Sequence, residues 1–455
     1  MPSKKIVCLG AGSHYFSRAL GDIAVMEGLS GSEVTLYDID FEKAQLMAKL
    51  GKRFAREAGT RVKMRACQSL VEAVDGADFA VSSIGGSGPS LGGVYGTAAH
   101  SADVMIPAKY GIYQIVGDTG GPAGMMMGLR SIPVYLSICT EMDRRCPEVV
   151  VLNHSNPMAV LCRAMLKYSG IRKVIGICHG VQGGIMQLAS LLGVQPEELE
   201  VVWIGTNHYY WFTRIRLHGR DVYPQAMAKA RALRHPHGEQ MSARLSEIYG
   251  HRLVYQEDGH ALEFYPFLAQ TQDPTNLPYG YGERVGPRYQ DLSIEAPGLS
   301  KAEQAKLRAE GLKEFAKRLS QRGLPEPEMS FIRGEGIASL IEAIATGKRQ
   351  VRILNLPNQG VVPNLPDHAV LEVEGVTDSQ GARGIYAGEA PLSLMGLLQK
   401  RIAWQELVVE AGVKGDCGLA LQALLMDEMA ILPEQSAQML NELLAASKDL
   451  LPQFK

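Results

Sequence analysis

The first half of the chain alternates short apolar runs with helical patterns, and this alternation constrains the fold more than any other feature. Runs rich in valine and isoleucine predict strands at residues 6–10, 34–37, 79–84, 149–153 and 174–178. Helical patterns at residues 17–27 and 42–58 separate the first of these runs. Strands separated by helices in this way form a parallel sheet with right-handed crossovers. We therefore expect an α/β protein.

The first predicted turn carries a glycine pattern that is typical of dinucleotide binding. Gly10 and Gly12 form a G-x-G motif between a strand and a helix, although Tyr15 stands where a third glycine is usual. Two glycines let the backbone approach a pyrophosphate at the start of the helix. The second strand ends in Asp38, whose carboxylate can bind both ribose hydroxyls and would repel a 2′-phosphate. These features predict NAD binding, although Asp38 could instead cap a helix.

Charge and composition exclude several other classes of protein. The 455 residues include 46 Lys and Arg against 48 Asp and Glu, which gives a net charge of −2 and no basic surface for nucleic acid. No run of 18 apolar residues predicts a membrane span. The seven cysteines contain no C-x-x-C pair, which favours a reducing compartment. Because the first predicted strand begins at residue 6, we expect no signal peptide and a cytoplasmic protein.

A glycine-rich segment follows the third predicted strand. It begins with Gly85 and carries six glycines up to Gly96. In a doubly wound sheet such a segment lies at the carboxyl edge, where ligands bind. It is either a lid or a long surface loop.

Polar residues also follow the next predicted elements. Asp118 lies just before a predicted helix at residues 123–145, where a carboxylate is stabilised by the helix dipole, so it could be a cap or a catalyst. Asn153 ends the fourth predicted strand, where it could bind a ligand or precede an ordinary helix start.

Cysteine and histidine follow two further predicted strands. Cys178 ends the strand at 174–178, and His208 follows a predicted strand at 201–205. Thiolate and imidazole from adjacent strand ends can share one divalent metal and leave positions open for substrate and water. A buried cysteine beside a histidine is the plain alternative. Farther on, Asp258, His260 and Glu263 form an ionisable cluster that could supply a general base or cap a helix.

The set of motifs resembles the NAD- and metal-dependent glycoside hydrolases of family 4. The resemblance covers nearly the whole chain and rests on the order and spacing of short motifs. They are Gly10-Ala11-Gly12-Ser13, Tyr37-Asp38-Ile39-Asp40, residues 111–119, Asn153-His154-Ser155-Asn156-Pro157-Met158, Gly176-Ile177-Cys178-His179, Gly205-Thr206-Asn207-His208, Leu356-Pro357-Asn358-Gln359-Gly360 and Asn364-Leu365-Pro366.

The resemblance implies an architecture and a set of site residues. It implies a Rossmann-type NAD-binding domain, expected at residues 1–195, and a mixed α+β catalytic domain, expected at 196–455, in a homodimer or homotetramer. By motif, Cys178 and His208 correspond to metal ligands, with Mn²⁺ the usual ion of the family. Asp118 corresponds to the acid/base group, and Asn153 and His179 to sugar-binding residues. The expected cofactor contacts are Gly10, Gly12, Ser13, Asp38, Gly85 and Asn153.

The resemblance also implies a mechanism that differs from that of most glycosidases. NAD⁺ oxidises C3 of the sugar, the metal chelates the C2 and C3 oxygens, and a base removes the C2 proton. Elimination of the aglycone, addition of water and return of the hydride complete the cycle, so NAD is a cofactor. We favour Asp258 as the C2 base, and His260 and Tyr265 are the other candidates.

The substrate expectation depends on two details. His179 follows Cys178, as in members that act on unphosphorylated sugars, and residues 258–264 are most similar to α-galacturonidase and α-glucuronidase members. We therefore expect α-hexuronides, with α-glucosides or α-galactosides as the alternative. Arg284 and Arg288 could bind a uronate or could be ordinary surface residues. A 2-hydroxy-acid dehydrogenase is the competing class of enzyme, which would need no metal.

Overall fold

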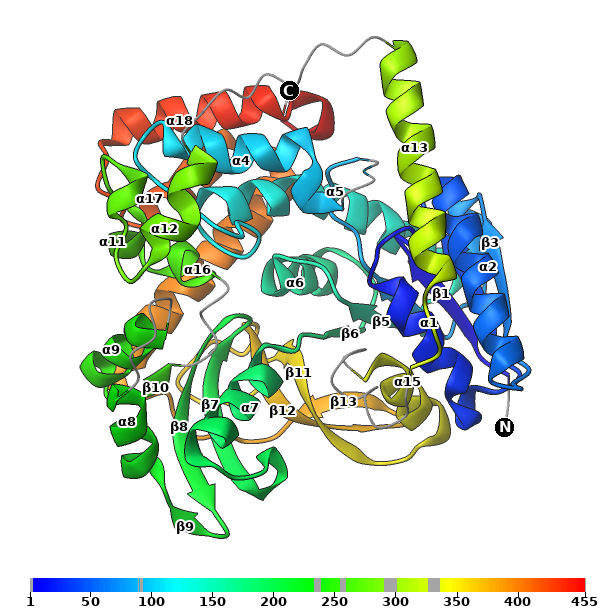
Figure 1. Cartoon of the computed structure of the whole chain (residues 1–455), viewed down its shortest axis with the longest axis horizontal. Coiled ribbons are helices and arrows are strands. Elements are labelled where there is room, and N and C mark those ends of the chain that lie inside the picture. Colours follow the sequence, from blue (N-terminus) through cyan, green and yellow to red (C-terminus); the bar gives the residue numbers. More distant parts are fainter. Residues whose placement is uncertain are drawn as a thin grey trace.

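The computed structural model describes residues 3–88, 90, 93–232, 239–253, 259–289, 301–325 and 336–454. Its centre is a nine-stranded sheet in the order β13-β12-β11-β6-β5-β4-β1-β2-β3 (Figure 1). The six strands β1–β6 are parallel, and their order 3-2-1-4-5-6 is that of a Rossmann-type dinucleotide-binding sheet. Their bounds are β1 Lys5–Leu9, β2 Glu33–Tyr37, β3 Lys63–Cys67, β4 Phe79–Ser82, β5 Val150–Asn153 and β6 Lys173–Gly176. The expected fold class is confirmed.

One strand of this parallel sheet was not expected from the sequence. Strand β3, Lys-Met-Arg-Ala-Cys, lies at the edge of the sheet beside β2. Its lysine and arginine side chains are exposed, whereas Met64 and Cys67 are buried. An edge strand with one solvated face contains no continuous apolar run, so the run-based prediction missed it.

Three more strands extend the sheet beyond β6. They are β11 Gln350–Pro357, β12 Val370–Asp378 and β13 Gly381–Gly384, and all three pairings are antiparallel. Strand β11 joins β6 where Asn355 faces Gly176, and a Cβ on Gly176 would lie 2.7 Å from the Asn355 Cβ. Residues on both sides of the expected boundary at 195 therefore share one sheet. The boundary itself stays a prediction.

A second sheet is antiparallel and lies beside α7 (Figure 1). It contains β7 Leu199–Thr206, β8 Tyr209–Leu217, β9 Arg220–Asp221 and β10 Arg252–Leu253. Strand β7 is not paired with β6, because β6 pairs with β5 and β11 while β7 pairs with β8. A tight turn joins β7 to β8, and His208 in that turn has a left-handed backbone with φ 61°.

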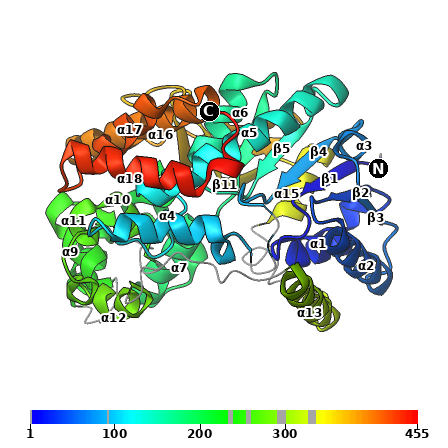
Figure 2. The ribbon, with the colours of Figure 1, turned by 90° about the horizontal axis from the view of Figure 1, so that it is seen from above.

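The helices cover both faces of the large sheet and form a helical layer at one end of the molecule. Figure 2 shows α4 and α18 side by side in this layer, where α16 also packs on α5, α6 and α17. In the N-terminal half the helices are α1 Phe16–Val25, α2 Phe41–Glu57, α3 Leu70–Val74, α4 Ala98–Ala108, α5 Gly121–Arg145, α6 Met158–Tyr168 and α7 Gly180–Leu192.

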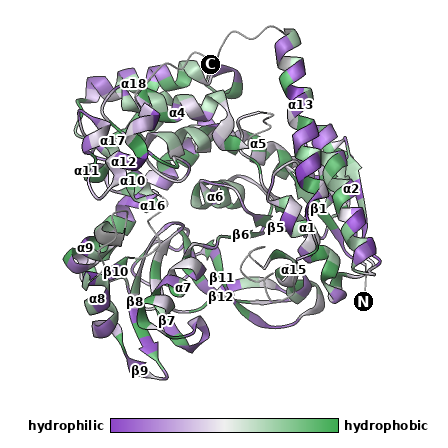
Figure 3. Cartoon of the chain, in the orientation of Figure 1, coloured by the Kyte–Doolittle hydropathy of each residue, from purple (hydrophilic) through white to green (hydrophobic). Residues whose placement is uncertain are grey.

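The remaining helices are α8 Tyr223–Ala232, α9 Glu239–Tyr249, α10 Ala261–Phe264, α11 Pro266–Ala269, α12 Tyr281–Val285, α13 Lys301–Ser320, α15 Ile337–Thr346, α16 Leu392–Lys414, α17 Cys417–Met426 and α18 Pro433–Ala446. Helix α13 projects from the body of the molecule, and hydrophilic residues mark much of its length in Figure 3. Among the helices that the structure describes, none has both the length and the apolar character of a membrane span.

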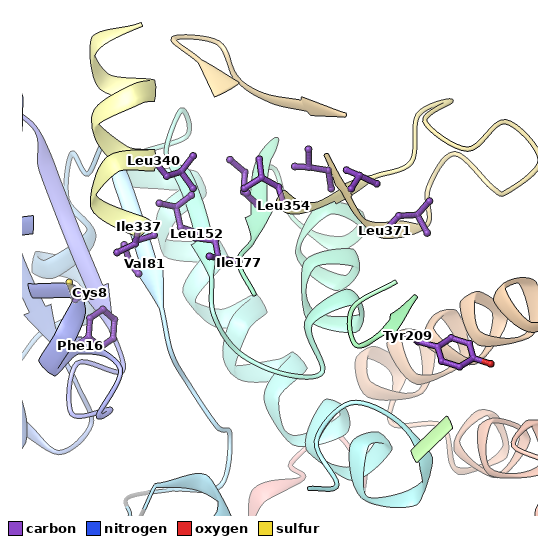
Figure 4. Close-up of a cluster of buried hydrophobic side chains, with 14 of the residues drawn as sticks. Cys8, Phe16, Val81, Leu152, Ile177, Tyr209, Ile337, Leu340, Leu354 and Leu371 are labelled. Atoms are coloured by element: carbon purple, nitrogen blue, oxygen red, sulfur yellow. The ribbon is translucent and has the colours of Figure 1, made fainter. Parts of the chain in front are cut away.

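The main hydrophobic core is continuous across the large sheet. It includes Cys8 on β1, Leu152 on β5 and Leu354 on β11, all of which are buried. Figure 4 shows Leu152, Ile177 and Leu354 close together, with Leu340 of α15 beside them. Burial of apolar area of this kind is the main favourable term in folding. The core therefore joins both halves of the chain and holds the carboxyl ends of the parallel strands in place.

Candidate functional site

The first turn of the sheet forms a narrow backbone cradle. Gly10 has φ 76°, and a Cβ at this position would lie 2.3 Å from the carbonyl oxygen of Ser83. A Cβ on Gly12 would lie 3.0 Å from the Asp38 carboxylate, and the Gly12 N–H donates to that carboxylate at 2.7 Å. The cradle lies between β1 and β4, where the strand order reverses and doubly wound sheets bind their ligands. The close backbone approach that Gly10 and Gly12 allow at this point is typical of a dinucleotide-binding turn.

Asp38 does not cap the following helix. Its Oδ1 accepts from the Asp40 N–H at 2.7 Å, while Asp40 itself accepts from the Lys43 N–H as the N-cap of α2. Burial raises the pKa of Asp38 despite the two backbone donors and Lys43. The carboxylate is thus held at the end of β2. Rossmann-type sites place there the acidic residue that binds the ribose hydroxyls.

Two other expected cofactor residues lie around this cradle. Ser13 accepts a hydrogen bond from the Ser83 hydroxyl at 2.9 Å, so it faces the strand end of β4. Gly85 packs against Val94, because a Cβ there would lie 2.8 Å from the Val94 side chain. Gly85 and Val94, at the two ends of the glycine-rich segment, therefore lie against each other.

Asp118 lies at the centre of a buried polar cluster and is 1% exposed. Its Oδ2 accepts from the Tyr95 hydroxyl at 2.6 Å and from the Asn156 amide at 2.9 Å. Its Oδ1 accepts from the Thr119 hydroxyl at 2.6 Å. Burial raises the pKa of Asp118, but His260, His208 and these hydroxyl donors outweigh it and lower the pKa below the usual value. Asp118 is therefore a carboxylate at neutral pH.

Asp118, His208 and His260 form a group that could hold a metal ion. One potential ligand atom from each lies within 4.8 Å of the others, and all three residues are buried. The rings of His208 and His260 are 3.9 Å apart between centroids. Cys178 joins this group through its Sγ, which lies 3.2 Å from the His208 Nε2. The non-adjacent strands β6 and β7 therefore still bring the expected thiol and imidazole together.

The tautomer of His208 follows from its neighbours. The single proton of the Thr119 hydroxyl is donated to Asp118, so the His208 Nδ1, 3.2 Å from that hydroxyl, must be the donor to it. Its Nε2 then carries the lone pair and lies 3.2 Å from the Cys178 Sγ. Burial, with the charge of His260, lowers the pKa of His208 well below its usual value, so the ring is a neutral ligand. Neutral imidazole, thiolate and carboxylate suit Mn²⁺, Fe²⁺, Co²⁺ or Zn²⁺.

The other expected site residues have different surroundings. His179 is the N-cap residue of α7, is exposed, and lies near enough to His208 to contribute to its lowered pKa. Asn153 is 0% exposed, and its amide bonds to Ser82, Tyr135 and Ser155 rather than lining the cluster. The roles of both as ligand contacts stay predictions. Asp258 lies outside the described residues.

Tyr265 lies in a pocket of aromatic rings, with Tyr209, Tyr249 and Phe267 around it. Burial, followed by its tyrosine neighbours, raises its pKa well above 10. Its role as a candidate for the C2 base stays a prediction.

Three side chains of the cluster were not selected from the sequence. Tyr95 comes from the glycine-rich segment; the residue as a whole is 52% exposed, but its hydroxyl reaches the buried Asp118. Asn156 lies three residues after the selected Asn153, and its amide donates to Asp118. Thr119 connects Asp118 to His208. Their neighbouring motifs were visible in the sequence, but which residue points into the site was not.

Comparison with known protein families identifies both halves of the chain. The model of the family 4 glycosyl hydrolases matches residues 5–194, and the model of the C-terminal domain of the same family matches residues 203–430.

Individual relatives match over nearly their full length. An alpha-galacturonidase of Bacillus subtilis is 31% identical over 97% of this chain and 96% of its own length. An alpha-galactosidase of the same organism is 29% identical over 99% of this chain and 100% of its own length.

Solved structures extend this likeness to the fold. The crystal structure of lplD from Bacillus subtilis has a TM-score of 0.78 at 29% identity and covers 97% of this chain and 100% of its own. A 6-phospho-alpha-glucosidase from gut microorganisms, solved in complex with NAD and Mn²⁺, has a TM-score of 0.76 at 21% identity, with 100% of both chains covered.

Proposed function

The chain belongs to family 4 of the glycosyl hydrolases and is a glycosidase, and from this premise we propose that it hydrolyses unphosphorylated α-glycosides, specifically α-hexuronides such as galacturonides or glucuronides. The observation that carries the proposed chemistry is a buried cluster. Asp118 bonds Thr119 and lies 3.7 Å from the His260 Nδ1, and His208 contacts both Thr119 and Cys178. This arrangement places a carboxylate, two imidazoles and a thiol in one cluster.

We propose NAD and a divalent metal, Mn²⁺, as the cofactors. The Gly10–Gly12 cradle and the Asp38 carboxylate fit the nucleotide, and Cys178 with His208 fits the metal, with Asp118 and His260 close by. When bound, NAD⁺ would accept a hydride from C3 of the sugar, and the metal would polarise the C2 and C3 oxygens.

The residues of the chain have distinct roles in this proposal. Asp118 accepts the proton of the C3 hydroxyl, and its lowered pKa keeps it ionised for that step. Tyr95 and Asn156 hold the carboxylate in one orientation through their hydrogen bonds to Oδ2. Among the residues that the structure describes, His260 is the candidate for the base at C2, and its ring lies 3.9 Å from that of His208. Asp258 stays the candidate that the sequence favours.

Two observations support a uronide as the substrate. Alpha-galacturonidases from four organisms match this chain at 27–31% identity. The Arg288 guanidinium donates to the carbonyl oxygen of Ile115 at 2.7 Å, which places a cation beside the segment that leads to Asp118. A substrate carboxylate would pair with such a guanidinium.

A panel of aryl glycosides tests the proposal. The α- and β-anomers of galacturonide, glucuronide, galactoside and glucoside are each incubated with NAD⁺, Mn²⁺ and thiol, and then with each omitted. We expect cleavage of an α-hexuronide that requires both NAD⁺ and Mn²⁺ and leaves no net NADH. Arg288→Gln should raise KM for the uronide about tenfold and leave the neutral glycosides unchanged, and Arg144→Gln, at an exposed arginine near the C-terminal end of α5, is the control.

Other outcomes separate the alternatives. Cleavage of an α-galactoside or α-glucoside in preference to the uronides would refute the proposed substrate and leave the proposed cofactors in place. Stoichiometric NADH from a hydroxy acid, with no requirement for metal, would replace the proposed mechanism with that of a dehydrogenase. The homo-oligomeric state and the cytoplasmic location remain predictions.

A further inference from the structure

Glu263 is buried beside the Asp118 cluster and has no role in the chemistry proposed above. It is 2% exposed and lies in α10. Its carboxylate accepts the backbone N–H groups of four consecutive residues, Gly117 at 3.1 Å, Asp118 at 3.2 Å, Thr119 at 2.7 Å and Gly120 at 2.7 Å. These four residues, which we call the Asp118 turn, carry the proposed acid/base group.

The same carboxylate also binds the second functional side chain. Its Oε1 lies 2.8 Å from the His260 Nδ1, and because a carboxylate can only accept, His260 carries its proton on Nδ1. A carboxylate that holds the far nitrogen of an imidazole is the usual means of orienting a metal-site histidine.

The position of Glu263 is favourable for a buried negative charge. The Asp118 turn leads directly into α5, a 25-residue helix whose N-cap is Gly120. Successive backbone N–H groups and the positive end of a helix dipole together stabilise an anion. The carboxylate thus has five donors and a favourable field, which offset the loss of water.

The backbone geometry confirms that the two segments are built to fit closely. Gly259 has φ 105°, and a Cβ there would lie 2.6 Å from the Ile115 side chain. A Cβ on Gly120 would lie 2.9 Å from the carbonyl oxygen of Glu263. Glycine is therefore needed on both sides for the Glu263 carboxylate to reach the Asp118 turn.

We propose that Glu263 is the positioning residue of this active site: its one carboxylate fixes the Asp118 turn and the His260 ring relative to each other. This inference rests on the proposed function only for the roles of Asp118 and His260. Glu263 does not touch the substrate in this account, and it acts through the two residues that it holds. Loss of the carboxylate should therefore disturb the metal site and the rate of the chemical steps more than the binding of NAD⁺.

The test compares Glu263→Gln with Glu342→Gln. Glu342 is a matched control, because its carboxylate accepts a single backbone N–H, from Gly28 at 2.9 Å, away from the site. In Glu263→Gln the amide nitrogen cannot accept a hydrogen bond, so some of the backbone N–H groups of the Asp118 turn, or the His260 N–H, lose their acceptor. We expect Mn²⁺ affinity, measured by the electron paramagnetic resonance signal of free Mn²⁺, to weaken at least tenfold. We expect kcat on the glycoside that the wild type cleaves to fall at least 100-fold, KM and NAD⁺ affinity to stay within threefold, and Glu342→Gln to match the wild type.

A double-mutant cycle distinguishes positioning from general destabilisation. If Glu263 acts through Asp118, Glu263→Gln should lower kcat much less in an Asp118→Asn background than in the wild type. Equal losses of kcat in the two backgrounds would overturn the proposal, as would Glu263→Gln with Mn²⁺ affinity and kcat within threefold of the wild type.

If Glu263→Gln does not fold, Glu263→Asp takes its place. Aspartate keeps the charge but is shorter by one methylene, so it cannot reach both the Asp118 turn and His260. We expect weakened Mn²⁺ binding and at least a tenfold loss of kcat, and wild-type values for both would overturn the proposal. Because Mn²⁺ binding is measured without substrate, a wild type that prefers another glycoside would refute the proposed substrate alone.

Discussion

Two buried aspartates show how neighbouring groups decide the ionisation of a residue. Asp118 and Asp22 are both almost completely buried, at 1% and 4% exposed. Burial raises the pKa of both, but in Asp118 imidazoles and hydroxyl donors reverse the direction of the shift. Asp22 has one oxygen without a hydrogen-bond partner and only the charge of Arg18 to oppose burial, so its pKa rises to about 7. The donors around a carboxylate, more than its burial, determine its charge at neutral pH.

The raised pKa of Asp22 predicts a pH-dependent stability. The folded state holds the proton up to about pH 7, whereas the unfolded chain releases it near 3.8. The free energy of unfolding should therefore fall as pH rises between these values, by at most about 1.4 kcal/mol per pH unit. Asp22→Asn removes this dependence. The free energy of unfolding of the variant, relative to that of the wild type, should therefore rise by about 2–4 kcal/mol between pH 4 and pH 7. Urea unfolding at several pH values measures the difference, and Asp449→Asn on the surface is the control.

A wild type and an Asp22→Asn variant whose unfolding free energies change in parallel with pH would contradict this prediction. It would mean that Asp22 is ionised in the folded protein and has a partner that compensates its burial.

At the scale of an element, the turn after β1 depends on a close backbone approach as well as on a left-handed conformation. Gly10 and Gly31 both have positive φ, 76° and 91°. A Cβ on Gly10 would lie 2.3 Å from the Ser83 carbonyl oxygen, whereas a Cβ on Gly31 would have no atom within 4 Å. Comparing the two glycines therefore separates the free-energy cost of a left-handed backbone from that of a steric clash.

This comparison predicts different results for two alanine substitutions. Gly31→Ala should cost about 1 kcal/mol of stability through backbone strain alone and leave NAD⁺ affinity unchanged. Gly10→Ala must also move β1 and β4 apart, so it should cost about 3 kcal/mol or more and weaken NAD⁺ binding at least tenfold. Thermal unfolding and NAD⁺ titration measure both effects. Equal losses of stability in the two variants would contradict the prediction, because they would show that the Ser83 carbonyl leaves room for a Cβ at position 10.

At the scale of the whole molecule, the large sheet joins segments that are far apart in the sequence. Strand β6 has β11 as its outer neighbour, although more than 170 residues separate them. The buried core continues from Ile177 to Leu354 and Leu371 on the C-terminal side. The two family models divide the chain between residues 194 and 203, but the sheet does not divide there.

The shared sheet predicts that the N-terminal part does not fold alone. A fragment of residues 1–195 would expose the edge of β6 and the apolar side chains that β11 and β12 cover. We expect this fragment to aggregate, or to show neither a cooperative unfolding transition nor NAD⁺ binding, whereas the full chain shows both. Circular dichroism on heating, light scattering and NAD⁺ titration provide the comparison. A monomeric fragment that binds NAD⁺ with the affinity of the full chain would show that residues 1–195 are an independent domain.

The sequence by itself determined the parts of this protein that depend on local pattern. Buried parallel strands are continuous apolar runs, so β1, β2, β4, β5 and β6 were predictable within a few residues. The Gly10–Gly12 turn and the meeting of Cys178 with His208 were also expected, the first from local geometry and the second from residue type and family resemblance.

The tertiary structure alone decided which distant segments meet. The sequence pattern did not indicate that β11 extends the sheet at β6 or that Tyr95 reaches Asp118 from the glycine-rich segment. The sequence pattern also did not show that Asn156, and not Asn153, points to Asp118. Nor did it indicate that Glu263 contacts the Asp118 turn. The physical reason is that strand patterns and turns record local backbone preference, whereas these contacts depend on packing between segments up to about 180 residues apart, for which a single sequence contains no periodic signal.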